Sequence, residues 1–466
     1  MDLDRLDGWF AQKEEEMVQA VGRLVAIKSV KEAPQPGKPY GPGPAAALSE
    51  GLKLAEELGF SIRNYDNQAG TVLLNDRPLK LDILAHLDVV GEGTGWNTPP
   101  YQAVLKDGML FGRGTDDDKG PVVASLYAML AVRETGIPLR YNTRLILGTN
   151  EESGFADLEY FFAREPHAEY TFSPDGSFPV INIEKGMYRP AFTGKFRTSP
   201  ELPRICALNG GYRINVVPPE AWAVVEGISK KEAEAACKAA EQETGAAFAV
   251  SDEDGDRLRI TAHGTGAHAS RPQEGNNALT ALLHLLCTMP MSESQGMCAL
   301  RGLHDLFPHG DSAGKAAGIA MEEPKSGKLT LALSLLHYEP SGLTGRFDSR
   351  TPLCATEENC AAVMTERLSA LGLSVSGQME RPHHTPEDSP FVQTLLRCYE
   401  ACTGDKGKCL ALGGGTYVHD VEGGVAFGGS MPGFQSNLHS ANEHISIRDF
   451  MLSAKIYARA ILALCQ

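Results

Sequence analysis

The sequence lacks any run of about 20 apolar residues, the length that a membrane-spanning helix needs. Its first residues also lack the basic segment and the apolar segment of a secretion signal. Basic residues are scarce relative to acidic ones, 43 against 59, and the formal net charge is -16. A surface of that sign repels phosphate backbones and anionic lipids. We therefore expect a cytoplasmic protein whose partners include neither nucleic acid nor a membrane.

Paired cysteine motifs are absent as well. The ten cysteines are scattered without any C-x-x-C pair, which indicates reduced and mostly buried thiols. No P-loop is present, and no G-x-G-x-x-G motif stands between a strand and a helix. Hydrophobic residues make up 42% of the chain, which is enough to form the hydrophobic core of a globular protein. The length of 466 residues exceeds that of a usual single domain, so we expect two or three domains.

Helical and extended patterns alternate over the first part of the chain. Helices are expected at 4–27 and 45–58, and strands at 61–65, 71–74 and 81–90. Asp107-Gly108 predicts a hairpin, a long helix follows residue 112, and TRLILGTNEESG gives the next strand. This alternation predicts an α/β catalytic domain with a mostly parallel central sheet flanked by helices.

From about residue 187 the sequence changes to β-like segments and amphipathic helices, the latter at 230–243, 276–289 and 357–371. This pattern predicts an α+β lid domain over residues 187–382. The lid would interrupt a catalytic domain made of residues 1–186 and 383–466. We interpret His383 and His384 as part of an interdomain loop and not as metal ligands.

Imidazole and acidic side chains gather where two predicted strands end. His86 and Asp88 close the strand LDILAHLDVV, and Glu151 and Glu152 close the next one. In α/β sheets, ligands collect outside the carboxyl ends of strands. The pattern H-x-D alone is explained better by a solvated strand end, and adjacent glutamates are commonly just exposed. A metal site becomes the better interpretation only when further candidate ligands are considered together with these residues.

Three consecutive aspartates, Asp116, Asp117 and Asp118, lie between a glycine turn and a predicted helix. Helix capping explains one or two of them, but three in a row repel one another unless a cation is present. Asp175 and His439, taken alone, are an ordinary turn residue and an ordinary loop histidine. Together these residues make a nitrogen and oxygen ligand set that suits zinc, cobalt or manganese and is too rich in nitrogen for calcium.

A family resemblance rests on eight motifs, which are AHLDVV, GRGTDDDKGP, GTNEESG, SPDGSFP, NVVPPEA, GTGAHASRPQEGNNA, FDSR and LHSANE. In order and spacing they resemble those of the co-catalytic zinc peptidase family that contains carboxypeptidase G, aminoacylase and dipeptidase V. The resemblance covers nearly the whole chain, and the dipeptidase V type is the most similar in length and in the size of the inserted domain. Asp116 departs from the family pattern, in which a small or apolar residue is more common.

The resemblance implies two Zn²⁺ ions per chain, with Co²⁺ or Mn²⁺ as substitutes. It implies five metal ligands, which are His86 and Asp175 for one ion, Glu152 and His439 for the other, and Asp117 between them. Asp88 would orient His86, and Glu151 would be the general base that activates the attacking water.

The resemblance also implies functional residues in the lid domain. His268 would stabilise the oxyanion, and Asn215 and Arg350 would bind the carboxylate of the substrate. Gly414 and Gly415, in the run GGGT, would offer backbone N–H groups to an anion. Without the resemblance, a turn histidine, an exposed strand arginine and a flexible glycine turn explain these residues as well.

The hypothesis that results is a metal-dependent dipeptidase for small unblocked peptides, β-Ala-His among them. Deacylation of N-acyl amino acids by the same site is the first alternative. A metal-binding protein without activity is the second, although the presence of every implied ligand and of the base argues against it. Because the lid is nearly twice as long as a dimerising lid of this family, we expect a monomer.

Overall fold

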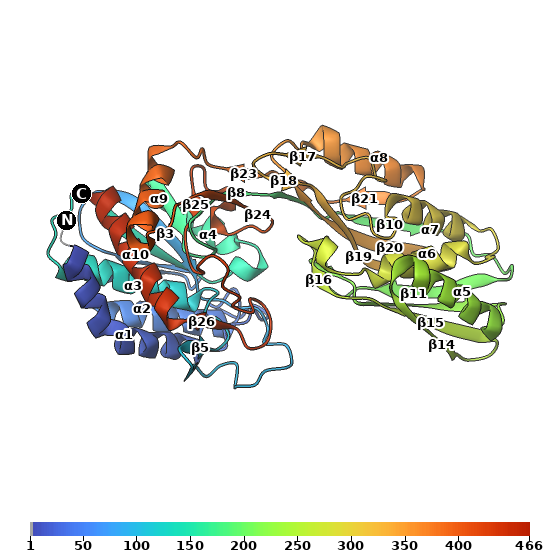
Figure 1. Cartoon of the computed structure of the whole chain (residues 1–466), viewed down its shortest axis with the longest axis horizontal. Coiled ribbons are helices and arrows are strands. Elements are labelled where there is room, and N and C mark those ends of the chain that lie inside the picture. Colours follow the sequence, from blue (N-terminus) through green and yellow to red (C-terminus); the bar gives the residue numbers. More distant parts are fainter. Residues whose placement is uncertain (1–2) are drawn as a thin grey trace. The chain divides into compact units, whose positions relative to one another are not determined.

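The computed structural model describes residues 3–466, which divide into two compact units (Figure 1). Unit 1 runs up to Ile183 and includes His384–Leu410 and Gly415–Gln466, whereas unit 2 comprises Glu184–His383 and Ala411–Gly414. The first boundary lies close to the one expected at residues 186 and 187. Ala411–Gly414, expected in the catalytic domain, belongs instead to unit 2, so Gly414 and Gly415 lie in different units.

A mixed sheet forms the centre of unit 1. Its strands are, in order, β1 (Ser61–Tyr65), β2 (Ala69–Leu73), β6 (Asn142–Gly148), β3 (Leu79–His86), β7 (Tyr170–Ser173), β25 (Val425–Ala426), β8 (Val180–Glu184) and β23 (His383–His384), with β24 (Cys409–Leu412) beside β8. β3 is parallel to β6 and β7, and β25 is parallel to β7. The pairs β1–β2, β2–β6 and β25–β8 are antiparallel. The α/β class is confirmed, but the sheet is parallel only at its centre.

The pair His383 and His384 forms the strand β23 and not the loop expected from the sequence. A strand of two residues has no periodicity that a sequence pattern could show. Its formation depends on the neighbouring backbone, which supplies hydrogen-bond partners for an added strand.

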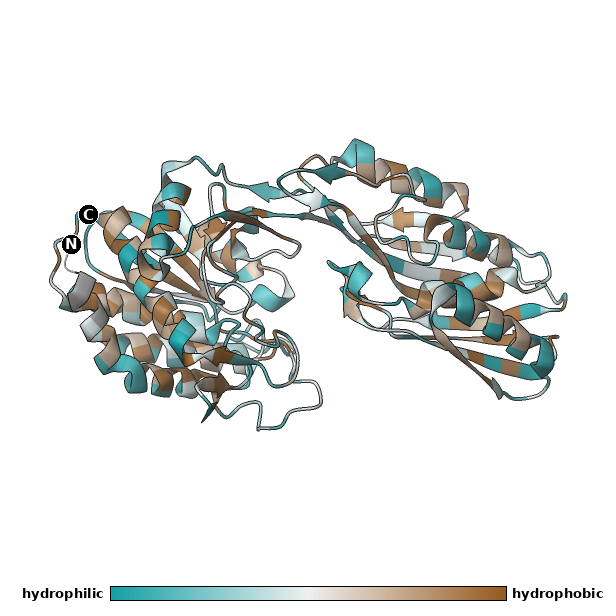
Figure 2. Cartoon of the chain, in the orientation of Figure 1, coloured by the Kyte–Doolittle hydropathy of each residue, from teal (hydrophilic) through white to brown (hydrophobic). Residues whose placement is uncertain are grey.

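Six helices surround the sheet of unit 1: α1 (Leu3–Val25), α2 (Pro42–Glu57), α3 (Lys119–Glu134), α4 (Ala156–Phe162), α9 (Pro390–Thr403) and α10 (Ile447–Cys465). Helix α3 is buried from Lys119 to Val132, on all of its faces. Such a helix is expected where it packs between a sheet and further helices. Figure 2 shows brown, apolar segments on strands of this sheet. The hairpin expected at Asp107-Gly108 is formed by β4 (Val104–Lys106) and β5 (Met109–Phe111), and β5 pairs with β26 (His444–Ser446). Both turn residues have positive φ angles.

Unit 2 contains a second, antiparallel sheet. Its strands are, in order, β14 (Ala247–Asp252), β15 (Arg257–His263), β13 (Glu220–Glu226), β11 (Arg204–Gly210), β19 (Thr330–Glu339), β20 (Gly342–Thr351), β10 (Ala191–Lys195) and β21 (Ser374–Ser376), with β9 (Gly186–Tyr188) and β22 (Met379–Glu380) at β20. Its helices are α5 (Lys230–Thr244), α6 (Ala278–Thr288), α7 (Gln295–Leu306) and α8 (Ala362–Ala370), the last preceded by a π-helical turn at Glu357–Ala361. Two small ladders complete it, β12 (Val216–Val217) with β16 (Ala267–His268) and β17 (Glu322–Glu323) with β18 (Gly327–Lys328).

Two properties of the described residues bear on the sequence predictions. None of their helices combines the length and the apolar character that crossing a membrane requires. All ten cysteines are free thiols, and of these only Cys298 and Cys354 are exposed.

Candidate metal centre and active site

Adjacent strand ends bring the candidate ligands of unit 1 together. His86 is the last residue of β3, Glu151 and Glu152 form a 3₁₀ turn just after β6, and Asp175 follows β7. Because β3 is parallel to both β6 and β7, these three ends lie at the same edge of the sheet. His439 reaches the same place from the segment before β26, with a φ angle of 57°.

Asp117 lies between the two histidines. Its Oδ1 is 2.9 Å from Nε2 of His86, and its Oδ2 is 2.8 Å from Nε2 of His439. Each carboxylate oxygen therefore faces a different imidazole, which is the arrangement of a carboxylate that bridges two metal ions.

Two groups of possible ligands can be separated around Asp117: His86, Glu151 and Asp175 in one, and Asp117, Glu152 and His439 in the other. Within each group the ligand atoms lie within 4.8 Å of one another. Glu151, for which the sequence predicts the role of general base, thus also lies within reach of an ion held by His86. Its role remains a prediction that a variant must test.

The donor atoms fit transition-metal ions. His86 Nε2, Asp117 Oδ1 and Glu152 Oε1 are buried and make no hydrogen bond within the protein. The first two are only 2.9 Å apart, yet they do not hydrogen-bond to each other. Leaving buried polar atoms without a partner is costly, and a cation in each ligand group would give these atoms a partner. Imidazole nitrogen with carboxylate oxygen is a donor set that zinc accepts.

Electrostatics of the cluster favour a cation as well. Burial, followed by repulsion from Asp117, raises the pKa of Asp175 to about 8. Burial likewise raises the pKa of Glu151 well above its ordinary value. Although burial alone would lower the pKa of His439, contacts with Asp117 and Glu152 raise it to about 11. Carboxylates packed this closely repel one another, and positive ions among them remove the repulsion.

Asp88 acts through two different groups. Its carboxylate oxygens accept hydrogen bonds from the backbone N–H groups of Glu151 and Glu152, at 3.1 and 3.2 Å. Its main-chain carbonyl oxygen lies 3.0 Å from Nδ1 of His86, whereas its Oδ1 is 3.5 Å away. The carbonyl is therefore the nearer partner of His86, and the carboxylate fixes the turn that carries the two glutamates. From the sequence, we had expected the carboxylate of Asp88 to orient His86.

The other two members of the aspartate run, Asp116 and Asp118, lie outside the ligand groups. Asp118 stands at the N-terminus of α3 without capping it, and its Oδ2 accepts the backbone N–H of His86 at 3.0 Å. Asp116 accepts a hydrogen bond of 2.8 Å from the Ser430 hydroxyl. Only Asp117 of the three belongs to a ligand group.

Asp157 is a site residue that the sequence analysis missed. It is fully buried, and its Oδ2 accepts the backbone N–H groups of Thr149 and Asn150 and the hydroxyl of Tyr417. Together with Asp88 it holds four successive N–H groups of the segment that leads into Glu151 and Glu152. In the sequence, Asp157 stands in the ordinary helical run ADLEYFF, and no local signal separates it from a solvated helix residue.

Two candidate residues of unit 2 are neighbours. β12 and β16 pair Val216 with His268, and the carbonyl of Asn215 accepts the N–H of Ala269 at 2.8 Å. Nδ1 of His268 lies 2.7 Å from the hydroxyl of Ser270. The sequence interpretation assigned Asn215 and His268 to one substrate site, and their backbones are joined in this small ladder.

Arg350 is buried, with 2% of its surface exposed, so it is not the exposed strand arginine of the alternative interpretation. Its Nε and Nη2 donate to Asp348 at 2.6 and 3.1 Å, and its Nη1 donates to the carbonyl of Gly413 at 2.6 Å. These bonds leave one N–H on each terminal nitrogen for another acceptor.

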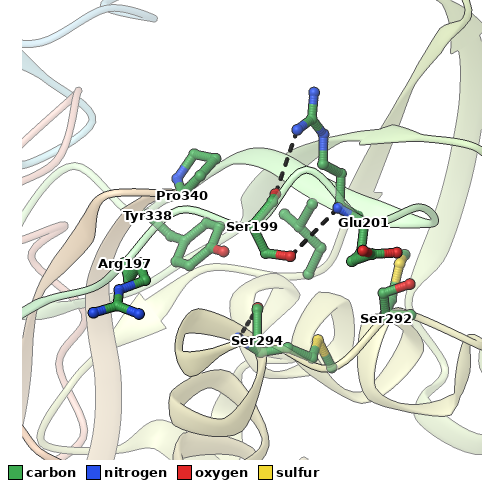
Figure 3. Close-up of a pocket in the computed structure, with 11 residues that line it drawn as sticks. Arg197, Ser199, Glu201, Ser292, Ser294, Tyr338 and Pro340 are labelled. Carbon is green, nitrogen blue, oxygen red and sulfur yellow. Dashed lines mark hydrogen bonds between the residues drawn. The ribbon is translucent and has the colours of Figure 1, made fainter.

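A small pocket in unit 2 is lined by a different set of residues (Figure 3). Arg197, Ser199 and Tyr338 are among its lining residues, and none of the predicted site residues is. The sequence GDSAG, at 310–314, matches the letters of a nucleophile elbow. However, Ser312 lies between α7 and β17 and not between a strand and a helix, so the structural context of a serine hydrolase is missing.

Comparison with known proteins agrees with this geometry. The model of peptidase family M20/M25/M40 matches residues 83–463. The chain belongs to this family. Members of the M20 family are metallopeptidases, and this chain is accordingly a hydrolytic enzyme with the fold class expected from its sequence.

Among M20 relatives, the putative dipeptidase YtjP of Bacillus subtilis (strain 168) is 33% identical, over 98% of each chain. The Beta-Ala-Xaa dipeptidase of Lactobacillus delbrueckii subsp. lactis is 32% identical, over 97% of this chain and 96% of its own. Human carnosine dipeptidase 1 has a similar fold, with a TM-score of 0.64, 16% identity, and coverage of 100% of this chain and 99% of its own.

Proposed function

We propose that this M20 enzyme is a dipeptidase that uses two zinc ions to hydrolyse short unblocked peptides. The observation that carries the proposal is Asp117, whose two carboxylate oxygens face two different histidines between two ligand groups. His86 and Asp175 would hold one ion, and Glu152 and His439 the other. The names of two relatives, one of them a Beta-Ala-Xaa dipeptidase, favour dipeptides over N-acyl amino acids.

The bound ions would polarise the scissile carbonyl and lower the pKa of a water molecule. The protein's own residues then move the protons. Glu151, held by its backbone N–H to Asp88, accepts a proton from the attacking water and passes it to the nitrogen of the leaving amine. Burial raises the pKa of Glu151 well above its ordinary value, which makes this carboxylate a stronger base.

Four residues of unit 2, together with Gly415 of unit 1, would recognise the substrate. We assign oxyanion stabilisation to His268 and carboxylate binding to Asn215 and Arg350, with backbone N–H groups of Gly414 and Gly415 as further donors. Arg350 keeps two unused N–H groups for this purpose. The enzyme is expected to act as a monomer, which sedimentation at nanomolar concentration tests.

Substrate end groups decide between the dipeptidase and the deacylase. A dipeptide carries an ammonium and a carboxylate, and burying either one without a partner is costly. We expect kcat/KM for an unblocked dipeptide such as Leu-Leu or β-Ala-His to exceed that of its N-acetyl or C-amide form by about 100-fold or more. A panel of dipeptides, blocked dipeptides and N-acyl amino acids measures this ratio. Faster turnover of N-acyl amino acids than of every dipeptide would establish the deacylase instead.

Metal content is measured on the same preparation. Elemental analysis should approach two transition-metal ions per chain, and chelation should abolish activity reversibly. Activity in protein that contains no transition metal would refute the two-zinc part of the proposal.

A further inference from the structure

Glu443 is a buried carboxylate outside the ligand groups, and its surface is fully covered. Its Oε1 accepts three backbone N–H groups, those of Gly114 and Asp116 at 3.0 Å and that of Asp117 at 3.2 Å. One oxygen thus holds most of the turn that carries the bridging candidate Asp117. Glu443 itself lies four residues after His439, in the segment LHSANE.

The second carboxylate oxygen of Glu443 pairs with the buried guanidinium group of Arg113. Oε2 lies 2.5 Å from Nη1 of Arg113, which is 1% exposed. Nη2 of Arg113 donates to the carbonyls of Gly91 and Ser440 at 3.3 and 3.2 Å. The main-chain carbonyl of Glu443 also accepts the N–H of Gly112 at 3.0 Å. The segments 440–443 and 112–117 are therefore joined through both side chains and backbone.

The ladder of β5 with β26 ends at the pair Phe111 and His444, so it brings the two segments together but does not include them. Asp117 lies six residues beyond one end of this ladder and His439 five residues beyond the other, in loops outside any strand. Two such loops deliver their ligands to one ion only if something sets the distance between them. Beyond the ladder, the buried contacts of Glu443, together with the bond of Arg113 to Ser440, join the Asp117 turn to the His439 segment.

We infer that Glu443 is a positioning residue: it fixes the turn of Asp117 relative to the segment of His439 and so sets the geometry of the metal site formed by Asp117, Glu152 and His439. This inference rests on the proposed function, because it takes those three residues as ligands. Some residues do not bind a metal ion but hold the residues that do. Replacing such a residue typically lowers metal affinity or activity by about 10–100-fold. Glu443 would act in this way through the backbone of the ligand loop.

A matched control exists in the same unit. Asp82 is a fully buried carboxylate that pairs with Arg144 through two contacts of 2.8 Å and accepts the N–H of Ala168 at 3.0 Å. It resembles Glu443 in burial, in its arginine partner and in its backbone bond. It lies on β3 four residues before His86 and holds no metal-ligand turn.

The experiment compares E443Q and D82N with the wild-type enzyme. In E443Q the amide presents N–H groups either to Arg113 or to the three backbone donors, so one set of bonds is lost. We expect both variants to lower the free energy of unfolding, but only E443Q to weaken zinc binding by about 10–100-fold in chelator-buffered titrations. E443Q should also change the visible absorption of the cobalt-substituted protein and lower kcat more than it raises KM.

The outcomes separate the two proposals. If wild-type protein binds no transition metal, the proposed function fails. If wild-type protein binds metal and E443Q matches D82N in zinc affinity and in the cobalt spectrum, Glu443 is structural and the inference is wrong. If E443Q does not fold, E443D decides, because it keeps the charge but its shorter side chain cannot reach both Arg113 and the three backbone N–H groups. A weakened zinc affinity in E443D supports the inference, and an unchanged one overturns it.

Discussion

At the scale of single residues, the environment gives identical carboxyl groups different chemistry. The pKa of Asp117 is held below its ordinary value by His439 and His86 despite burial, whereas burial raises the pKa of Glu151. Asp117 is therefore suited to remain a charged ligand, and Glu151 to exchange a proton. The two residues lie in one cluster, so the difference comes from which side chains each of them touches.

Replacement of Glu151 tests this division. We expect E151Q to lower kcat by about 100-fold or more while metal content stays at the wild-type level, because the base is lost and the ligands remain. E152Q, its neighbour, should instead lose metal. Elemental analysis measures the metal content of both variants, and steady-state kinetics measure their kcat. Loss of metal in E151Q would assign Glu151 to the group of His86 and Asp175 as a ligand.

Asp157 gives a prediction for pH. Burial, followed by repulsion from Asp88, raises its pKa to about 6. The folded protein then keeps a proton that the unfolded chain loses above about pH 4, so this residue costs stability as pH rises from about 4 to about 6 and has a constant effect above. In chelator, the free energy of unfolding of wild type should fall relative to D157N by up to ~3 kcal/mol across that window.

Chemical denaturation at a series of pH values measures the difference. Asp76→Asn, at an exposed loop position of the same unit, controls for the removal of a charge. Parallel curves for D157N and wild type would show that Asp157 does not titrate as its burial implies.

The sequence predicted histidines and acidic residues that stand at the end of a strand. It missed acidic residues whose hydrogen-bond partners are far away in the sequence. His86 and Glu151 close strands that the sequence predicted, so their meeting at one edge could be expected, whereas Asp175 taken alone was an ordinary turn residue. Asp157 and Tyr417 are 260 residues apart, and Glu443 and Gly114 are 329 apart. A single carboxylate at such a distance leaves no local pattern, because its partners are backbone N–H groups that every sequence has.

At the scale of elements, the strands and helices were predictable and their ends were not. Apolar periodicity indicated α1, α2, α5 and α6 to within a few residues. The strand expected at 81–90 ends at His86, because Asp88 turns its carboxylate to the backbone of Glu151. The long helix begins at Lys119, directly after the aspartate run, as the sequence indicated, and the turn before it is held by Glu443. Contacts of the site thus decide where these elements stop.

The end of β6 is packed too closely for any side chain. A Cβ atom on Gly148 would lie 1.9 Å from the hydroxyl oxygen of Tyr417 and 2.7 Å from Oδ2 of Asp157. G148A should therefore lower the free energy of unfolding by about 1–3 kcal/mol or more and reduce kcat, because it displaces the carboxylate that holds the turn before Glu151.

Gly22 offers the matched control. A Cβ there meets only the Cβ of Ala103, at 3.6 Å, within the helix α1. G22A should raise stability by roughly 0.5–1 kcal/mol, as alanine favours a helix over glycine. Thermal unfolding of the two variants tests the contrast, and equal stability of G148A and wild type would contradict the packing argument.

At the scale of the whole molecule, the metal centre couples catalysis to folding. The ligands come from segments as distant as His86 and His439, which are adjacent only in the folded chain. Any ion that binds the folded form alone stabilises it, by ~4 kcal/mol at a free concentration of 1,000 times the dissociation constant. Without ions, the same acids oppose folding, because they are buried and repel one another. The sign of a ligand's contribution to stability should therefore depend on the metal.

Asp175 allows this sign change to be measured. Its pKa of about 8 lies above the ordinary value, so in metal-free protein its contribution to stability falls as pH rises from about 4 to about 8. D175N removes that cost together with one metal ligand. In chelator at pH 8, D175N should be more stable than wild type, and in excess zinc it should be less stable. Thermal unfolding under both conditions gives the two differences. If D175N is the less stable protein in chelator as well, Asp175 supports the fold by contacts of its own, and repulsion among the acids is not what a metal ion relieves.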